Sequence, residues 1–276
     1  MTLRQQQALH VGIAGLGAVG LPVARWLDDR ANNHGLKLAA VSARNLEMAE
    51  KKVAGFKKVP PVVEINQLIE VSDIVVEGLP PEIFEELAEP TIAQGKILIV
   101  MTLTSLMKRL DLIDKAKETG AIVIAASGAL VGFDGVRAAS KGKIDSVLMK
   151  TRKPPLGLKK APFVLEMGID MNSLTEPLLL YKGTVREAAA KFPANVNVAV
   201  ALALAGVGLD NTEYEIWADP GVSRNLHNIT VEADAVSLNL DIANVPSEVN
   251  PATGKLTPLS AIATLERLVA PFTVGT

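Results

Sequence analysis

The chain has 276 residues, of which 49% are hydrophobic and 21% charged, and its formal net charge is -2. This length is enough for two domains with a substantial core, and the nearly balanced charge gives no electrostatic reason to expect nucleic acid or an anionic membrane as partner. The absence of cysteine excludes disulfides, thiolate nucleophiles and cysteine-ligated metal sites.

The first ten residues, MTLRQQQALH, contain no apolar segment of signal-peptide length. No uninterrupted stretch of the chain approaches the ~18 apolar residues that span a bilayer. We therefore expect a cytoplasmic protein without a membrane partner.

A glycine-rich segment, VGIAGLGAVG at 11–20, is the most informative local pattern of the first half. Val11–Ala14 predicts a buried strand. Gly15, Gly17 and Gly20 have the G-x-G-x-x-G spacing of a dinucleotide-binding turn. The first glycine makes the tight turn, the second lets the backbone approach a pyrophosphate, and the third lets the following helix pack on the strand.

The surroundings of this turn favour a bound cofactor over a purely structural glycine turn. An amphipathic segment follows at 21–27, and a second apolar strand, Leu38–Val41, lies at the distance expected in a βαβ unit. The helix after the turn presents free N–H groups and its positive dipole end to the phosphates. The residues expected to bind the cofactor here and after the next strands are Gly15, Leu16, Gly17, Ala18, Val19, Gly20, Ser42, Arg44, Gly78, Leu79 and Pro80.

The loop after the second strand indicates which dinucleotide is bound. NAD-selective sites usually have Asp or Glu there to bind the ribose 2′-hydroxyl, whereas this chain has SARN at 42–45. A guanidinium can bind a 2′-phosphate in two places, and a carboxylate would repel it. We expect NADP or NAD as the cofactor, with NADP favoured, unless Arg44 is an ordinary solvated loop residue.

Strand and helix signals alternate through the first half, which predicts an α/β fold with a Rossmann-type doubly wound parallel sheet. A helix is expected at Asn45–Val53, and further strands at Asp73–Val76, Ile97–Met101 and Ala121–Ala126. Ligands of open α/β sheets bind outside the carboxyl ends of the strands. The turns at Gly78–Pro80, Thr102–Thr104 and Ser127–Ala129 should therefore border one crevice, with Thr102–Ser105 as an exposed polar end.

After Gly128 the pattern changes to that of a second α/β domain with a mostly antiparallel or mixed sheet. We expect the dinucleotide-binding domain at 1–128, the substrate and dimerisation domain at 129–254, and a C-terminal helix within 255–276 that packs back on the first domain. The expected elements are a strand at Val147–Arg152, a loop at Lys153–Pro155, helices at Thr184–Lys191, Asn195–Val207 and Ser260–Val269, and strands at Glu213–Ala218 and Ile229–Asn244.

Only three histidines are present, and His227 is the one in a segment that favours function. It lies in DPGVSRNLHN at 219–228, which is rich in turn residues and is expected to form a loop between two strands. A histidine there can titrate near neutral pH and exchange protons with a substrate or water. The alternative is a surface or hydrogen-bonded loop histidine. His34 is expected to be solvated, and His10 to lie in an untethered end.

Arg224 and Lys153 are candidates for binding a substrate carboxylate. The alternative, which is more common for such side chains, is a solvated position on the surface. Asn195 and Asn197 follow Phe192–Pro193 and either cap a helix or hold a polar group of a ligand. Several carboxylates show no metal-ligand spacing, and we predict no metal site. They are Asp134, Asp170 and Asp210.

Five blocks of the second half occur in the order and spacing of a known family. They are SGALVGFDGV (127–136), TRKPP (151–155), YKGTVREAAAKFPANVNVAVALALAG (181–206), ADPGVSRNLHNI (218–229) and NPATGKLTPLSAIATL (250–265). These blocks resemble the L-aspartate dehydrogenase family. The N-terminal glycine motif also fits that family, so the resemblance covers nearly the whole chain.

The resemblance implies an enzyme that deaminates L-aspartate, a small dicarboxylic amino acid, to iminoaspartate and then to oxaloacetate and ammonia, reversibly and with NAD(P). Hydride passes from the substrate Cα to the nicotinamide, and the catalytic histidine, a general acid/base, falls on His227. The residues used around the nicotinamide fall on Ala129 and Asn197. In this family the sheet of the second domain also builds a homodimer contact. The candidates for binding the substrate are Arg224, Asn225 and Lys153.

Two departures from the family pattern leave the exact substrate open. The family commonly has Thr-Ser where this chain has Thr253–Gly254, and a glycine-containing turn where it has Glu232–Ala235. Both are expected near the substrate side of the second domain. The alternatives are an NADPH-dependent reductase of another small dicarboxylic imine or semialdehyde, and a dinucleotide sensor without catalysis.

Overall fold

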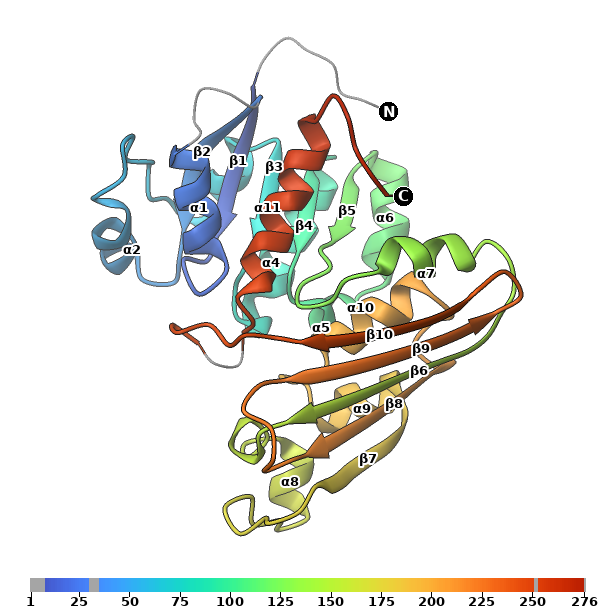
Figure 1. The fold of residues 1–276 in the computed structure, drawn as a ribbon. Helices are drawn as coiled ribbons and strands as arrows, with labels where there is room; N and C mark the ends of the chain where they lie inside the picture. The colour runs from blue at the N-terminus through green and yellow to red at the C-terminus, as the bar shows by residue number, and fades with distance from the viewer. Residues whose placement is uncertain (1–7, 30–34, 251–252, 276) are drawn as a thin grey trace. The chain divides into compact units, whose positions relative to one another are not determined.

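The computed structural model describes residues 8–29, 35–250 and 253–275. The chain forms two compact units (Figure 1). Unit 1 contains the chain up to Gly128 together with Thr257–Val274, and unit 2 contains Ala129–Leu256 and Gly275.

Unit 1 is built on a five-stranded sheet in the order β2-β1-β3-β4-β5, in which every pairing is parallel. The strands are β1 (Leu9–Ala14), β2 (Leu36–Ser42), β3 (Ile74–Glu77), β4 (Ile97–Val100) and β5 (Ile122–Ala125). All residues of β3 and β4 are buried, as expected for central parallel strands that are covered on both faces. The predicted Rossmann-type sheet is confirmed.

The helices of unit 1 are α1 (Gly20–Asp29), α2 (Leu46–Val53), α3 (Ile65–Glu70), α4 (Phe84–Ala93), α5 (Leu103–Leu106), α6 (Asp111–Thr119) and α11 (Leu256–Val269), with a 3-10 turn at Pro81–Ile83. The C-terminal helix α11 contributes to the core of this unit. Its Ala261 and Leu265 are fully buried in the same apolar cluster as Val11 and Ile13 of β1.

Thr102–Ser105 is not the exposed polar end that we expected. The strand β4 ends at Val100, and Thr102, Thr104 and Ser105 are buried in and before the short helix α5. The reason is that the Glu77 carboxylate, at the end of β3, accepts hydrogen bonds from Thr102. These bonds hold the polar segment inside the unit.

The expectation for His10 was also wrong. His10 lies within β1, its backbone N–H donates to Asp73 Oδ2 at 2.8 Å, and its ring Nδ1 is 3.4 Å from the same oxygen. His34 lies outside the described residues.

Unit 2 contains a mixed five-stranded sheet in the order β10-β9-β6-β8-β7. The strands are β6 (Ile144–Lys153), β7 (Leu178–Thr184), β8 (Thr212–Ala218), β9 (Leu226–Ala233) and β10 (Ser237–Ala243). The central strand β6 pairs parallel with β8 and antiparallel with β9, and the two edge pairings are antiparallel. This confirms the predicted mixed sheet.

The helices of unit 2 are α7 (Phe133–Ala139), α8 (Pro162–Glu166), α9 (Val185–Lys191) and α10 (Asn197–Ala205), with a 3-10 turn at Pro155–Gly157. In Figure 1, α9 and α10 lie behind the sheet of unit 2. Alternate residues of β6, namely Val147, Met149, Thr151 and Lys153, are buried, whereas Lys150 and Arg152 between them are exposed. One face of the sheet is therefore covered and the other is open.

The predicted single strand at Ile229–Asn244 is a hairpin instead. β9 ends at Ala233 and β10 begins at Ser237. Asp234 fixes the turn, because its backbone N–H donates to the Lys143 carbonyl at 2.9 Å and its carboxylate accepts the Lys143 N–H at 3.2 Å. The apolar alternation that we assigned to one strand belongs to two paired strands.

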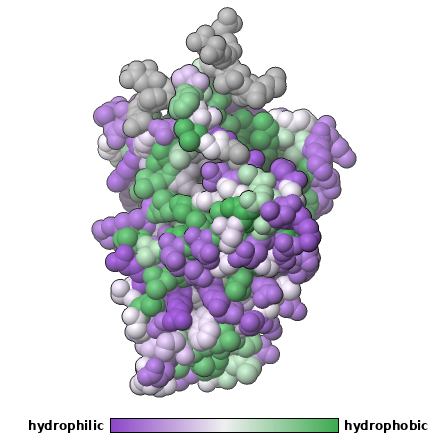
Figure 2. All heavy atoms as spheres, turned by 45° about the vertical axis from the view of Figure 1, so that its right-hand side comes forward, coloured by the Kyte–Doolittle hydropathy of each residue, from purple (hydrophilic) through white to green (hydrophobic). Residues whose placement is uncertain are grey.

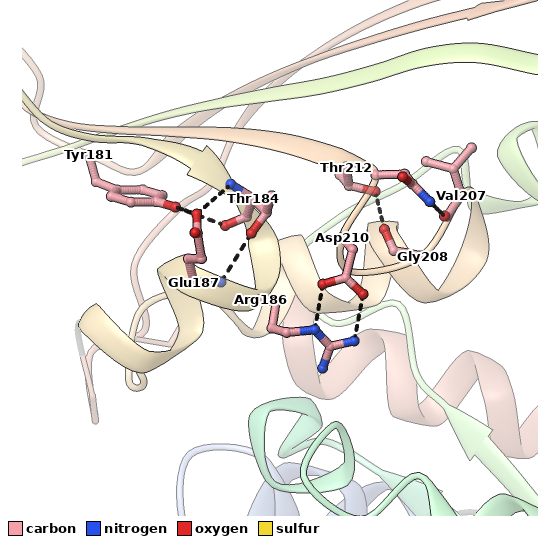
Figure 3. Close-up of polar contacts among 9 residues, drawn as sticks. Tyr181, Thr184, Arg186, Glu187, Val207, Gly208, Asp210 and Thr212 are labelled. Carbon is pink, nitrogen blue, oxygen red and sulfur yellow. Dashed lines mark hydrogen bonds and ion pairs between the residues drawn. The ribbon is translucent and has the colours of Figure 1, made fainter.

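A reciprocal cap fixes α9 to the end of β7 (Figure 3). The Thr184 hydroxyl accepts the N–H of Glu187, and the Glu187 carboxylate accepts the N–H of Thr184 and the hydroxyl of Tyr181. Arg186 binds Asp210 through two bonds of 2.6 and 2.8 Å. These contacts hold the first turn of α9 to the end of β7 and to the turn before β8.

In the described part of the chain, every helix is too short or too polar to span a membrane. Figure 2 shows polar and apolar side chains interspersed over the face that it draws.

Candidate active site

The glycine-rich turn of unit 1 contains one glycine that packing does not require. A Cβ on Gly15, which has a φ of +95°, would lie 2.3 Å from the Gly78 carbonyl oxygen, and a Cβ on Gly20 would lie 1.8 Å from that of Gly15. Gly17 is exposed, and a Cβ there would meet nothing within 4 Å. A structural turn explains Gly15 and Gly20, whereas open space at Gly17 fits a turn whose backbone must approach a ligand.

The predicted cofactor-binding residues of unit 1 lie together at the carboxyl ends of its strands. The Gly15 N–H donates to the Ser42 carbonyl at 2.7 Å, and the Gly78 N–H donates to the Ala14 carbonyl at 2.8 Å. Leu16 and Leu79 are buried, Ala18 and Val19 are half-buried, and Pro80 is exposed.

Two cations flank this turn. Arg44, two residues beyond β2, is exposed and has no hydrogen bond or ion pair with any described residue. Lys52 of α2 donates to the Leu16 carbonyl at 2.8 Å, a contact that the sequence analysis missed. No acidic residue follows β2 in the SARN loop. The surroundings of this loop therefore suit an anionic group.

Glu77 is a functional candidate that the sequence analysis did not single out. Its carboxylate accepts the N–H groups of Leu79, Met101 and Thr102 and the Thr102 hydroxyl, at 2.8–3.0 Å. Burial raises its pKa, and the bonds from Thr102 oppose that rise. One side chain thus joins the turn at 78–80 to the turn at 102–104. The sequence contained one signal for this residue, namely a single carboxylate at the end of an apolar strand.

In unit 2, His227 lies in a strand and not in a loop as predicted. It is the second residue of β9 and pairs with Thr151 of β6, whose hydroxyl is hydrogen-bonded to Nδ1 of the ring at 3.0 Å. Only 3% of its surface is exposed. Burial, and then the nearby charge of Lys153, lowers the pKa of His227 to about 3. The expectation that it titrates near neutral pH was therefore wrong.

Lys153 is buried, with 7% of its surface exposed, so the solvated alternative is wrong for this residue. It ends β6 and does not begin a loop, and its Nζ lies 3.1 Å from both the backbone carbonyl and the side-chain oxygen of Asn195. Burial lowers its pKa to about 8. Asn195 does not cap a helix, because α10 begins at Asn197 and its capping residue is Val196.

A second group of predicted residues meets around Asn244. The Asn244 side chain donates to the Ala129 carbonyl at 3.0 Å, and its backbone N–H donates to the Asn225 carbonyl at 2.9 Å. Asn225 lies two residues before His227, and Asn197 lies two residues after Asn195. Arg224 is exposed and makes no hydrogen bond or ion pair within the described ranges, so the structure does not bring its side chain to the others.

In residues 8–29, 35–250 and 253–275, no three His, Asp or Glu side chains gather closely enough to hold a metal ion.

A family model described as "Aspartate dehydrogenase, C-terminal" matches residues 134–268, and one described as "Homoserine dehydrogenase, NAD binding domain" matches residues 15–126. An L-aspartate dehydrogenase of Bradyrhizobium diazoefficiens is 48% identical over 268 residues, which are 97% of this chain and 94% of the relative. The chain belongs to the L-aspartate dehydrogenase family.

Further relatives agree with this assignment. L-aspartate dehydrogenase 3 of Bordetella bronchiseptica is 44% identical over 99% of this chain and 100% of its own length. The crystal structure of aspartate dehydrogenase from Thermotoga maritima has a TM-score of 0.72 at 22% identity, covering 97% of this chain and 99% of that one. This last likeness concerns the fold.

One of the two departures from the family pattern lies far from His227. Glu232 and Ala233 end β9, and Asp234 and Ala235 follow in the β9–β10 turn. Glu232 lies five residues along β9 from His227, or roughly 17 Å at a rise of ~3.3 Å per residue. Our expectation that it lies near the substrate side stays a prediction. Gly254 does lie in the group around Asn244, because a Cβ there would be 3.5 Å from the Asn244 side-chain oxygen.

Proposed function

We propose that this chain is an NAD(P)-dependent L-aspartate dehydrogenase. In the forward direction, L-aspartate, water and NAD(P)+ give oxaloacetate, ammonium, NAD(P)H and a proton, by way of iminoaspartate. The observation that carries the proposal is the 48% identity to an L-aspartate dehydrogenase over nearly the full length of both chains.

Unit 1 serves as the dinucleotide-binding domain in this proposal. The backbone of the turn at 15–20, with open space at Gly17, holds the pyrophosphate, and Ser42, Gly78, Leu79 and Pro80 line the rest of the site. When bound, the nicotinamide supplies the hydride acceptor. Arg44, exposed and without a partner among the described residues, and the absence of an acid in the SARN loop favour a 2′-phosphate, so NADP is the preferred cofactor.

Unit 2 serves as the substrate domain, and His227 is its acid/base residue. Its ring is neutral near pH 7, because its pKa is about 3, so it can accept a proton from the water that attacks the imine carbon. Thr151 holds the ring in one orientation. Ala129 and Asn197 are the candidates for contact with the nicotinamide, and Arg224, Asn225 and Lys153 for contact with the substrate.

A homodimer through the sheet of unit 2 is also part of the proposal. The open face of that sheet carries a half-buried Trp217 with the Arg152 guanidinium 5.5 Å above its ring. A mass in solution of twice 29.2 kDa, measured by light scattering, is the expected result. A monomer at micromolar concentration would contradict it.

The assay for this function follows the absorbance of the reduced nicotinamide with purified enzyme, NADP+ or NAD+, and a panel of amino acids. Aspartate is expected to support turnover, whereas asparagine, alanine and homoserine are not. Reduction of a dicarboxylic imine or semialdehyde without aspartate oxidation would favour the reductase alternative. Binding of dinucleotide without any turnover would favour the sensor.

A further inference from the structure

Lys153 is a buried cation without a counter-ion. Its two hydrogen bonds, both to oxygens of Asn195, are to neutral groups. Among the described residues, no carboxylate lies within ion-pair distance of its Nζ. Lysine is almost never buried unless its charge is paired, because an unpaired ammonium loses its hydration without compensation.

The charged and titratable groups around Lys153 do not provide the missing anion. His227, on β9, is neutral near pH 7. Asp219, which follows β8, donates its backbone N–H to the Lys153 carbonyl at 2.9 Å. Its carboxylate, however, binds Arg152 at 3.1 Å and the Gly221 N–H at 2.8 Å. The turn between α9 and α10 contributes only the neutral Asn195.

We propose that Lys153, held in place by both oxygens of Asn195, binds one carboxylate of the dicarboxylate substrate. This inference rests on the proposed function. It identifies Lys153 as the anion anchor, meaning the residue that binds the substrate carboxylate, among the three candidates Arg224, Asn225 and Lys153. Two of the three N–H groups of the ammonium are engaged by Asn195, which leaves one for the ligand. The ligand carboxylate supplies the counter-ion that the described part of the chain does not offer to Lys153.

Binding of the carboxylate is coupled to a proton. In the free enzyme, the pKa of Lys153 is about 8, so part of the population is neutral at and above that pH. An anion beside the ammonium favours the charged form and raises this pKa. Ligand binding therefore takes up part of a proton between pH 8 and the raised pKa of the complex, and this uptake falls to zero well below pH 8.

The carboxylate also affects His227. The charge of Lys153 is the second cause of the low pKa of His227. An anion that neutralises this charge raises the pKa of the imidazole and makes it a stronger base when substrate is present. Asn195 is thus a positioning residue, because it acts through Lys153.

The test is calorimetric titration of the enzyme, saturated with NADP+, with succinate, a dicarboxylate that has no amine and cannot be deaminated. Titrations at pH 8.5 in two buffers of different ionisation enthalpy give both affinity and proton uptake. Lys153→Met is expected to weaken succinate binding by roughly 100-fold, the loss typical of removing one partner of a buried charge pair. His227→Asn is expected to retain the proton uptake.

Asn195→Asp tests the positioning role. The substitution keeps the size of the side chain and places a carboxylate 3.1 Å from Nζ, which gives Lys153 an internal counter-ion. It is expected to weaken succinate binding and to abolish the proton uptake at pH 8.5, because Lys153 is then already charged. If Lys153 is not the group that takes up the proton, the uptake is unchanged. Lys150→Met, on the open face of the same strand, is the matched control and should bind succinate like the wild type.

Several outcomes would overturn the inference. Wild-type affinity and proton uptake in Lys153→Met would do so, as would failure of the wild-type enzyme to bind succinate. Loss of folding in Lys153→Met is checked by its melting curve, and in that case the Asn195→Asp result decides. If the wild type does not oxidise aspartate, the proposed function fails, whereas the succinate titrations still show whether Lys153 is an anion anchor.

Discussion

The pairing of β6 with β9 places His227 opposite Thr151 and buries the imidazole. Thr151 lies two residues before Lys153 on β6. With its pKa lowered to about 3, the ring is neutral near pH 7, and in the proposed reaction it would accept a proton from water. General-base help of this kind contributes roughly 10²–10⁴-fold to the rate. His227→Asn should lower kcat by that factor and leave the KM for the cofactor unchanged, as measured by steady-state kinetics. Unchanged kcat would show that the ring takes no part.

The buried neutral imidazole also makes folding dependent on pH. The pKa of His227 is about 3 in the folded state and ~6.5 in an unfolded chain. Between these values the unfolded chain binds the extra proton, so this residue makes the free energy of unfolding rise with pH across that window. The melting temperature should fall from pH 7 to pH 5, and fall less in His227→Asn. An equal fall in both proteins would contradict the pKa.

Arg44 decides the choice between NADP and NAD if its guanidinium binds the 2′-phosphate. Arg44→Ala should raise the KM for NADP by roughly 10- to 100-fold, because that is the loss in affinity expected when a hydrogen bond to a charged group is removed. The KM for NAD should change little. Lys117→Ala, an equal change of charge at the exposed end of α6, is the control. If the two variants behave alike, Arg44 is a solvated loop residue.

At the scale of elements, Glu77 joins the end of β3 to the end of β4. Glu77→Gln keeps the size and shape of the side chain. In the variant, however, the amide NH2 group faces backbone N–H groups that donate to a carboxylate oxygen in the wild type. We expect a loss of about 1–3 kcal/mol in the free energy of unfolding and a higher KM for the cofactor, because the turn at 78–80 is no longer held. Glu82→Gln, on the exposed 3-10 turn, is the control for both measurements.

The central strands β3 and β4 of unit 1 could be predicted because each is a mostly apolar run that is buried on both faces. The position of His227 could not, since its neighbours in sequence are turn residues, while its pairing partner, Thr151, is 76 residues away. The same holds for Lys153, whose neighbours Pro154 and Pro155 suggested a loop. Its burial depends on Asn195, 42 residues further on. Residues of this kind acquire their chemistry from long-range pairing that local pattern does not contain.

For the molecule as a whole, the proposed cofactor-binding residues lie mainly in unit 1, and the proposed acid/base and substrate-binding residues lie in unit 2. Unit 1 has open space at Gly17 of its glycine-rich turn, and unit 2 has a buried imidazole near a buried lysine that forms no ion pair with the described residues. The resemblance in sequence covered both halves, and the comparisons confirmed the family for nearly the full length. The resemblance alone could not predict the pKa values of Lys153 and His227, because these depend on how deeply each side chain is buried.

The proposed function depends on hydride transfer from Cα of aspartate to the nicotinamide. This step can be followed with L-aspartate carrying deuterium at Cα, by mass spectrometry of the reduced cofactor and by comparison of initial rates with unlabelled substrate. We expect one deuterium in each molecule of NAD(P)H formed, together with oxaloacetate and ammonium. Reduced cofactor without deuterium, or no reduction of either cofactor with aspartate, would contradict it.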